Sequence, residues 1–339
     1  MKDFKINFIK ITPYIFVTLI AICSFKILMT LHLPNVDTLT NSAISVIDGR
    51  PQWKAFQNRL LGPYSIYGIS NIIGVSFRTA WFIYNAITLQ IFCVLIFWIL
   101  RNEGFSLKDA FTYLVVLLFA FLTLQNPWLY AWDNLDLIIF TCFTYGIIKS
   151  YSFSFFLVIF FIGVLNRESA LFISVYLMLN AFKFSKGGLP IKLTNYKSLI
   201  SGLVMLVCGI IYTQFIRNLF FLSNTEGKPD LDHELIGNHI YFLGNLENIF
   251  FTNFTNHHFL ITILIFSLFA YFIRNFRSMY DREIKLLIMS LFIFVNILIF
   301  GVFNETRMHF ILLPFFLFLW ICLNDKILNK QQTKKLTKL

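Results

Sequence analysis

The chain has 339 residues, of which 58% are hydrophobic and 13% are charged, about half the charged fraction usual in a soluble domain. Apolar runs of roughly 20 residues recur along it, so the composition excludes a soluble globular protein and indicates an integral membrane protein. The net charge of +11 does not indicate nucleic-acid binding, because the basic residues lie in short loops between apolar runs.

The expected fold is an all-α, polytopic bundle of transmembrane helices. The N-terminal residues 1–10 are basic, an apolar run follows without a small-residue cleavage site, and we interpret the two together as a retained signal anchor. Residues 64–77 are read as an interfacial or re-entrant helix, and residues 135–182 hold either three short spans or two long ones. About ten spans are expected, with 8–11 compatible with the pattern: 11–32, 79–100, 109–125, 135–149, 152–165, 169–182, 198–216, 257–273, 284–303 and 308–323.

The distribution of charge predicts which loops face the cytoplasm. With a cytoplasmic N-terminus and ten spans, 19 of the 28 Lys and Arg residues fall on the cytoplasmic side, as the positive-inside rule requires. The C-terminus is then cytoplasmic as well. We expect a single transmembrane domain over residues 1–325, with long outer loops at about 33–78 and 218–256, and a basic cytoplasmic tail at 326–339.

The titratable residues favour the outer side. Eleven of the 17 Asp and Glu residues and all six His residues map there. The five cysteines lie singly inside apolar runs, so they are expected to be small apolar residues of helices and not metal ligands or a disulfide framework.

The first outer loop carries two candidate carboxylates. Asp37 follows the first span, and its alternative role is that of a helix cap. Asp48 precedes Gly49, and Asp-Gly is a dipeptide typical of turns.

The next outer turn places Asp133 and Asp136 three residues apart, on one face of a helix. A carboxylate at the membrane edge needs a partner or a ligand, so a structural pairing and a binding site remain the two alternatives. Trp128 and Trp132 are expected in an interfacial aromatic belt.

Two tight outer turns combine an arginine with an acid. Arg167 and Glu168 are adjacent, and Glu305 lies close to Arg307 and His309. Each turn is either a structural ion pair or a site that binds an anion, because arginine makes bidentate contacts with phosphate.

The second long outer loop contains an acidic run with histidine. Its residues Asp230, Asp232 and His233 are compatible with a divalent cation. The alternative is a solvated acidic loop.

Together these features resemble the GT-C superfamily of polytopic membrane glycosyltransferases. The resemblance rests on topology, on Asp37 followed by Gly49 and the segment FQNRLLGPY at 56–64, and on the runs LNRESALF at 165–172 and NETR at 304–307, which are similar to uncharacterised bacterial members. The first loop has no Asp-x-Asp motif, so a divalent cation such as Mg or Mn and the choice between Asp37 and Asp48 stay open.

The resemblance implies a site on the outer face of a bacterial inner membrane. It implies a polyprenyl-phosphate-linked sugar as donor, a glycan or glycolipid as acceptor, and membrane lipids as further partners. The implied roles are Asp37 as the general base, with Asp48 as second choice; Arg167, Arg307, Arg59 and His309 as phosphate-binding groups; and Glu168, Glu305, Asp133 and Asp136 as supporting polar groups.

Two other functions remain as alternatives. A glycan polymerase or ligase would use a diphosphate-linked oligosaccharide with the same outer arginines. A lipid or solute transporter would need polar residues deep within several spans, where this sequence is mostly apolar.

Overall fold

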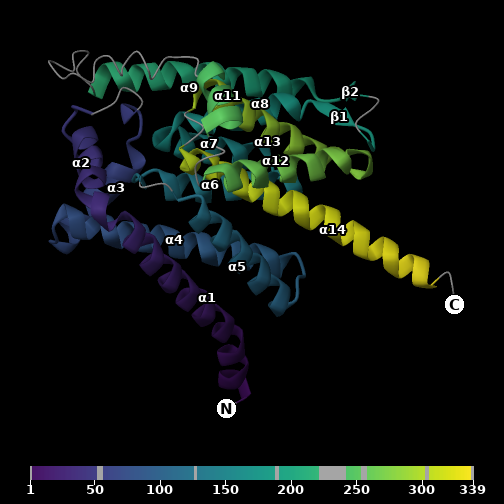
Figure 1. Ribbon diagram of the computed structural model, residues 1–339. Helices are drawn as coiled ribbons and strands as arrows, with labels where there is room; N and C mark the ends of the chain where they lie inside the picture. Colours follow the sequence, from purple (N-terminus) through teal and green to yellow (C-terminus); the bar gives the residue numbers. More distant parts are fainter. Residues whose placement is uncertain are drawn as a thin grey trace. The chain divides into compact units, whose positions relative to one another are not determined.

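The chain is almost wholly helical, which confirms the predicted all-α, membrane-type architecture (Figure 1). The computed structural model describes residues 2–51, 56–125, 128–187, 191–220, 242–252, 258–301 and 305–336. Residue contacts divide the chain into two compact units. Unit 1 comprises Met1–Thr141, Ile162–Glu168 and Thr213–His239, and unit 2 comprises Cys142–Phe161, Ser169–Tyr212 and Ile240–Leu339.

The elements follow one another as helices joined by short connections. The first part of the chain contains α1 (Lys2–His32), the 3-10 turn η1 (Leu33–Asn35), α2 (Val36–Ile47), α3 (Leu61–Ile73), α4 (Phe77–Asn102), α5 (Leu107–Thr123), α6 (Asp133–Lys149), α7 (Phe153–Asn166), η3 (Glu168–Ala170) and α8 (Leu171–Leu179). The second part contains β1 (Phe182–Phe184), β2 (Ile191–Leu193), α9 (Tyr196–Phe220), α11 (Phe242–Glu247), η4 (Asn248–Thr252), α12 (His258–Arg274), η6 (Phe276–Ser278), α13 (Asp281–Phe300), η7 (Thr306–Leu312) and α14 (Leu313–Leu336).

Each of the ten predicted apolar segments contains a helix. Within the described ranges, five helical runs are long and apolar enough to cross a membrane: Ile11–Ile47, Phe77–Asn102, Tyr196–Asn218, Asp281–Phe300 and Thr306–Asn324. The stretch 135–182 forms three helices, α6, α7 and α8, and not two long ones. These three and α5 and α12 are shorter than the ~20 residues of a perpendicular span, so the ten-span count stays a prediction.

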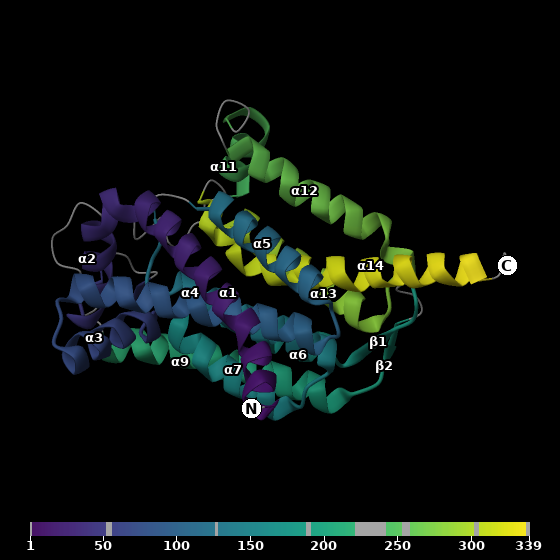
Figure 2. The ribbon, with the colours of Figure 1, turned by 90° about the horizontal axis from the view of Figure 1, so that it is seen from below.

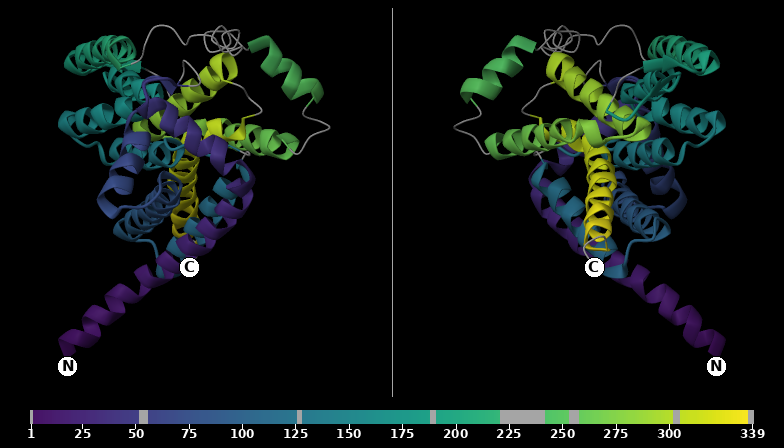
Figure 3. Two further views of the ribbon diagram at one scale, coloured as in Figure 1. Left: turned by 90° about the vertical axis from the view of Figure 1, so that its left-hand side faces the viewer. Right: turned by 90° about the vertical axis from the view of Figure 1, so that its right-hand side faces the viewer.

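In unit 1, α1 packs on α4 and α5 (Figure 2). Phe97 of α4 lies between two rings, with its centroid 5.4 Å from that of Tyr14 in α1 and 4.9 Å from that of Phe111 in α5. The side chains of Ser76 and Ser106 accept hydrogen bonds from backbone N–H groups in the first turns of α4 and α5, which fixes where these helices begin. The N-terminal end of α1 projects beyond α4 and α5 (Figure 3).

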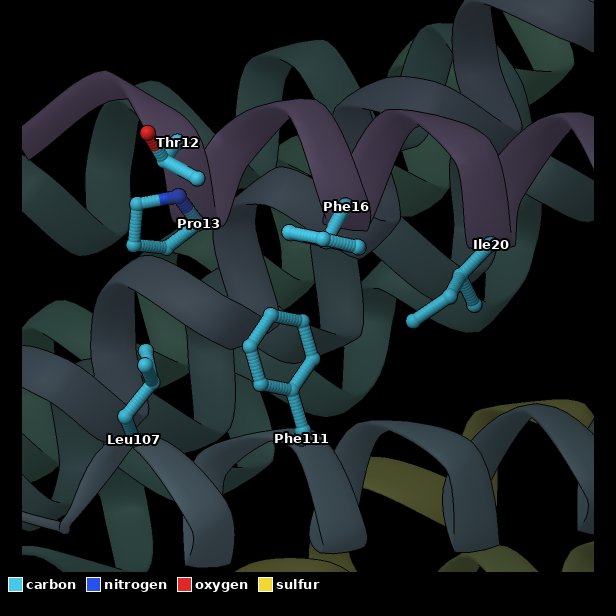
Figure 4. A pocket seen from close by; sticks show the side chains of 6 residues that line it. All are labelled: Thr12, Pro13, Phe16, Ile20, Leu107 and Phe111. Carbon is cyan, nitrogen blue, oxygen red and sulfur yellow. The ribbon is translucent and has the colours of Figure 1, made fainter. Parts of the chain in front are cut away.

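An apolar groove of about 580 Å³ lies between α1 and α5. It is lined from α1 by Thr12, Pro13, Phe16 and Ile20, and from α5 by Leu107 and Phe111 (Figure 4). Because the lining is apolar and belongs to the first candidate span, the groove suits a hydrocarbon chain of the bilayer.

In unit 2, α13 packs against α8, α11 and α14. The ring of Phe143 in α6 lies 5.5 Å from that of Tyr176 in α8 and 6.0 Å from that of Phe315 in α14. The Glu283 carboxylate accepts a hydrogen bond from the backbone N–H of Tyr280 at 2.9 Å, which caps the start of α13. Aromatic contacts of this kind form much of the core of the unit.

One element was not predicted. The segment after residue 182, expected to be a cytoplasmic loop, contains an antiparallel pair of strands in which Phe182 lies opposite Leu193 and Phe184 opposite Ile191. Both strands alternate apolar and basic residues, the period-two pattern of a strand. Three residues on each side were too few to distinguish this pattern from an ordinary basic loop.

Replacement of Gly62 by alanine should destabilise the protein by about 1–3 kcal/mol, the usual cost of overpacking. A Cβ atom at Gly62 would lie 2.5 Å from the backbone oxygen of Ala131, which has no flexible end that could move away. Gly68 is the matched control, because it lies in the same helix and a Cβ there meets nothing within 4 Å. Thermal unfolding in detergent measures both variants, and equal melting temperatures would contradict the expected close contact between α3 and residue 131.

Candidate functional site

Three segments that the charge distribution assigned to the outer side lie together in unit 1. The backbone N–H of Leu60, in the first outer loop, donates to the carbonyl of Leu165 at 2.9 Å. The side chain of Asn166 donates to the carbonyl of Trp132 at 2.9 Å. The structure therefore brings the turns at 56–60, 128–136 and 165–168 into contact, as expected for segments on one side of a membrane.

A buried ion cluster connects two of these turns. The guanidinium Nη1 of Arg167 lies 3.2 Å from Oδ2 of Asp136 and 3.9 Å from Oδ1 of Asp133. All three side chains are at most 10% exposed. Asn166 donates a further hydrogen bond to Oδ1 of Asp136 at 2.8 Å. The predicted pairing of Asp133 and Asp136 on one face is thus satisfied by a cation, which fits the structural alternative.

The third turn joins the cluster through aromatic rings. The guanidinium carbon of Arg59 lies 4.6 Å from the ring centroid of Trp132 and 5.0 Å from that of Phe56. The ring of Tyr130 stacks on Trp132 with centroids 4.9 Å apart. Trp132 is fully buried, so its expected place in an interfacial belt is wrong. Its ring instead receives a cation–π contact from a desolvated arginine.

A second group of buried polar side chains connects the start of α6 to α4. Asn134 donates to the side chain of Asn85 in α4 at 3.0 Å, and the hydroxyl of Tyr84 donates to the carbonyl of Ala131 at 2.6 Å. These four residues are at most 4% exposed, so their hydrogen bonds fix the start of α6 against α4 without access to water.

Glu168 does not pair with its neighbour. Its carboxylate accepts from the guanidinium of Arg217 in α9 at 2.7 Å, while Arg167 binds the acids of α6. The two side chains diverge because η3 begins at Glu168 and turns the chain away from the end of α7. The adjacent Arg-Glu pair of the sequence is therefore two separate contacts in the structure.

Asp37 is an exposed carboxylate at the start of α2. It lies in the first turn of α2, and the N-cap position belongs to Asn35, so Asp37 is not the cap residue. Its Oδ1 lies 3.0 Å from Nη1 of Arg78, with the two side chains 77% and 51% exposed. Asp48 is the C-cap residue of α2, and Gly49 follows with φ +69°, which confirms the turn interpretation of that dipeptide.

The last predicted turn belongs to unit 2. Arg307 donates to the Glu305 carboxylate at 2.6 Å, and its side chain is 6% exposed. His309 is buried in the same 3-10 turn, η7. The structure therefore contains the ion pair that was one of the two interpretations of this turn.

The metal prediction concerns residues that the structure does not describe. Asp230, Asp232 and His233 lie outside the described residues. Among the side chains that the structure does describe, no group of three or more His, Cys, Asp and Glu residues is arranged to hold a metal ion.

Arg78, which pairs with the candidate carboxylate Asp37, was not among the residues predicted from the sequence. It follows the capping residue Ser76 by two positions and was read only as the end of the first outer loop. The available signal was its charge, because the predicted outer side carries only eight of the 28 basic residues. An arginine at a span end on that side is unusual enough to suggest a specific partner.

Comparison of the chain with protein-family models, with curated proteins and with solved structures finds no match.

Replacement of Arg167 by methionine should cost about 3–5 kcal/mol of stability, because it leaves two buried carboxylates without their cation. Replacement of Glu168 by glutamine should cost less, about 1 kcal/mol, since the Glu168 and Arg217 side chains are still 31% and 21% exposed. Thermal unfolding in the same detergent compares the two neighbours. A loss at Arg167 no larger than that at Glu168 would contradict the structural role of the cluster.

Proposed function

We propose that this chain is a membrane glycosyltransferase of the GT-C type. It would transfer a sugar from a polyprenyl-phosphate donor to a glycan or glycolipid acceptor at the non-cytoplasmic face. The observation that carries the proposal is the exposed pair of Asp37 and Arg78, in which an accessible carboxylate is held by a cation just beyond the first apolar helix.

The length of the first helical run supports this position of Asp37. The run Ile11–Ile47 has 37 residues, whereas about 20 suffice to cross the hydrocarbon core. Asp37 lies 26 positions after Ile11 and therefore falls past the end of such a span. Earlier in the chain, His32 at the end of α1 shares a hydrogen bond of 2.8 Å with Gln125, which lies just after α5.

The chemistry requires a base and a cation at the same place. The Asp37 carboxylate would take the proton of the acceptor hydroxyl while the acceptor oxygen bonds to the anomeric carbon of the sugar. The bond from that carbon to the phosphate oxygen breaks, and the released polyprenyl phosphate needs a positive partner. Arg78 is already in contact with the carboxylate and can supply the phosphate with two donors in a fixed geometry.

The phosphate-binding groups predicted from the sequence differ from Arg78 in their surroundings. Arg59 and Arg167 are buried against rings and carboxylates of unit 1, and Arg307 is buried against Glu305. Their contacts favour the positioning of backbone over direct phosphate binding. We therefore propose Arg78 as the first phosphate-binding residue, ahead of Arg167, Arg307, Arg59 and His309.

Replacement of Asp37 by asparagine should lower glycosyl transfer by about 10²–10⁴-fold, the usual contribution of a general base. Replacement of Asp48 by asparagine is the matched control and should leave most activity, because that residue ends α2 in a turn. Transfer from a labelled polyprenyl-monophosphate sugar, measured in proteoliposomes, compares the two. Full activity of the Asp37 variant would remove this residue as the base. Transfer only from a diphosphate-linked donor would favour a polymerase, and uptake of label without any covalent product would favour a transporter.

Replacement of Arg78 by glutamine should raise the KM for the lipid donor by about tenfold or more, the value of a charge-assisted hydrogen bond of 1.5–3 kcal/mol. Asp37 stays in place in this variant, so the KM for the lipid donor should rise more than the KM for the acceptor. Arg50, which is also exposed in the same loop, is the control for a general loss of positive charge. Equal effects at both arginines would contradict a specific role of Arg78.

A further inference from the structure

The strands β1 and β2 place two lysines directly opposite each other. In the antiparallel register Lys183 pairs with Lys192, and both side chains are exposed. Like charges at opposed positions destabilise a strand pair. An arrangement of this kind is favourable where an external anion lies between the two charges.

The other face of the hairpin is apolar and only partly covered. Phe184 of β1 is buried at 7% exposure, but its partner Ile191 is 51% exposed and Leu193 is 57% exposed. Tyr196, just after β2, is 62% exposed. The hairpin therefore presents lysines on one face and partly exposed apolar side chains on the other, an amphipathic composition of the kind found in elements that lie at a membrane surface.

The hairpin is held firmly in unit 2. The backbone N–H of Phe184 donates to Oδ1 of Asp281 at 2.8 Å, and that of Gly187 donates to the carbonyl of Met279 at 3.2 Å. After β2, the backbone N–H of Thr194 donates to the carbonyl of Ala181 at 2.8 Å. The first two bonds tie β1 and the turn after it to the start of α13, and the third closes the base of the hairpin, so the exposed residues have a fixed position.

Further positive charge surrounds the pair. Lys186 lies over the ring of Tyr280 at 5.6 Å from its centroid, and Lys197 is exposed at the start of α9. The nearby carboxylate of Asp281 is already bound to Lys285 at 2.7 Å. The acid that anchors the hairpin is therefore itself neutralised by a buried lysine.

We propose that the β1–β2 hairpin binds the anionic headgroups of the lipid leaflet on the side that the charge distribution assigns to the cytoplasm. Lys183 and Lys192 would bracket lipid phosphates, while Ile191, Leu193 and Tyr196 would rest among the upper acyl chains. β1 pairs with only one edge of β2, and the backbone groups on the other edge of this exposed strand need water, which holds the hairpin at headgroup depth and no deeper. This inference does not depend on the proposed glycosyl transfer.

Hydrogen exchange on the full-length protein in nanodiscs tests the proposal. The nanodiscs contain either phosphatidylcholine alone or phosphatidylcholine mixed with phosphatidylglycerol. Amides of Phe182–Phe184 and Ile191–Leu193 should exchange at least about five-fold more slowly in the anionic discs, the equivalent of about 1 kcal/mol for one lysine near an anionic surface. High salt should remove the difference, because exposed charges are screened.

A double variant, Lys183→Gln with Lys192→Gln, should lose the dependence on anionic lipid. It should not unfold the hairpin in phosphatidylcholine, because the substitution removes a repulsion. Lys108→Gln with Lys149→Gln is the matched control. It removes the same charge from two exposed positions at the ends of α5 and α6, which the charge distribution also assigns to the cytoplasmic side, and it should keep the dependence.

Three results would overturn the proposal. One is equal exchange of the wild-type hairpin in both lipids, which would leave the lysines as topological signals only. Another is full protection by inorganic phosphate added to phosphatidylcholine discs, which would indicate a site for a free anion. The third is protection that appears only in native membranes and in neither disc, which would indicate a protein partner.

Discussion

The contact of Arg167 with Asp133 and Asp136 is the constraint on which the architecture of unit 1 depends. Removing charges from water costs several kcal/mol for each ion unless opposite charges and hydrogen bonds surround them. Here the arginine comes from the end of one helix and the acids from the start of another. Their burial therefore requires the two turns to lie in contact, and Asn166 reinforces the requirement through Asp136 and the backbone at Trp132.

The outer arginines and acids form two kinds of contact in the structure: a buried ion cluster and an exposed ion pair. A buried arginine between two carboxylates has little positive charge left for a ligand, and its exchange of partners would expose unpaired charges. Asp37 and Arg78 lie largely in solvent, where charges can exchange partners at small cost. The buried cluster therefore fixes the turns at 128–136 and 165–168, and the accessible carboxylate lies at the start of α2.

Local structure followed from composition wherever an apolar run was long. The long apolar segments are helical because roughly 20 apolar residues have no other way to satisfy their backbone in lipid. Asp48-Gly49 formed a turn because glycine tolerates a positive φ. The β1–β2 hairpin was missed because its strands have three residues each, and its period-two pattern is confined to a segment where basic residues alone already favour a loop.

The sequence by itself determined the membrane class, the positions of the helices and the set of charged turns assigned to the outer side. Those properties depend on short-range patterns of hydrophobicity and charge along the chain. The tertiary structure alone decided the partners: Arg167 with the acids of α6, Glu168 with Arg217, and Asp37 with Arg78. Each of these pairs joins residues more than 30 positions apart in the sequence. Adjacent charges such as Arg167 and Glu168 are separated by the turn of the backbone, and only the folded chain specifies which opposite charge each one reaches.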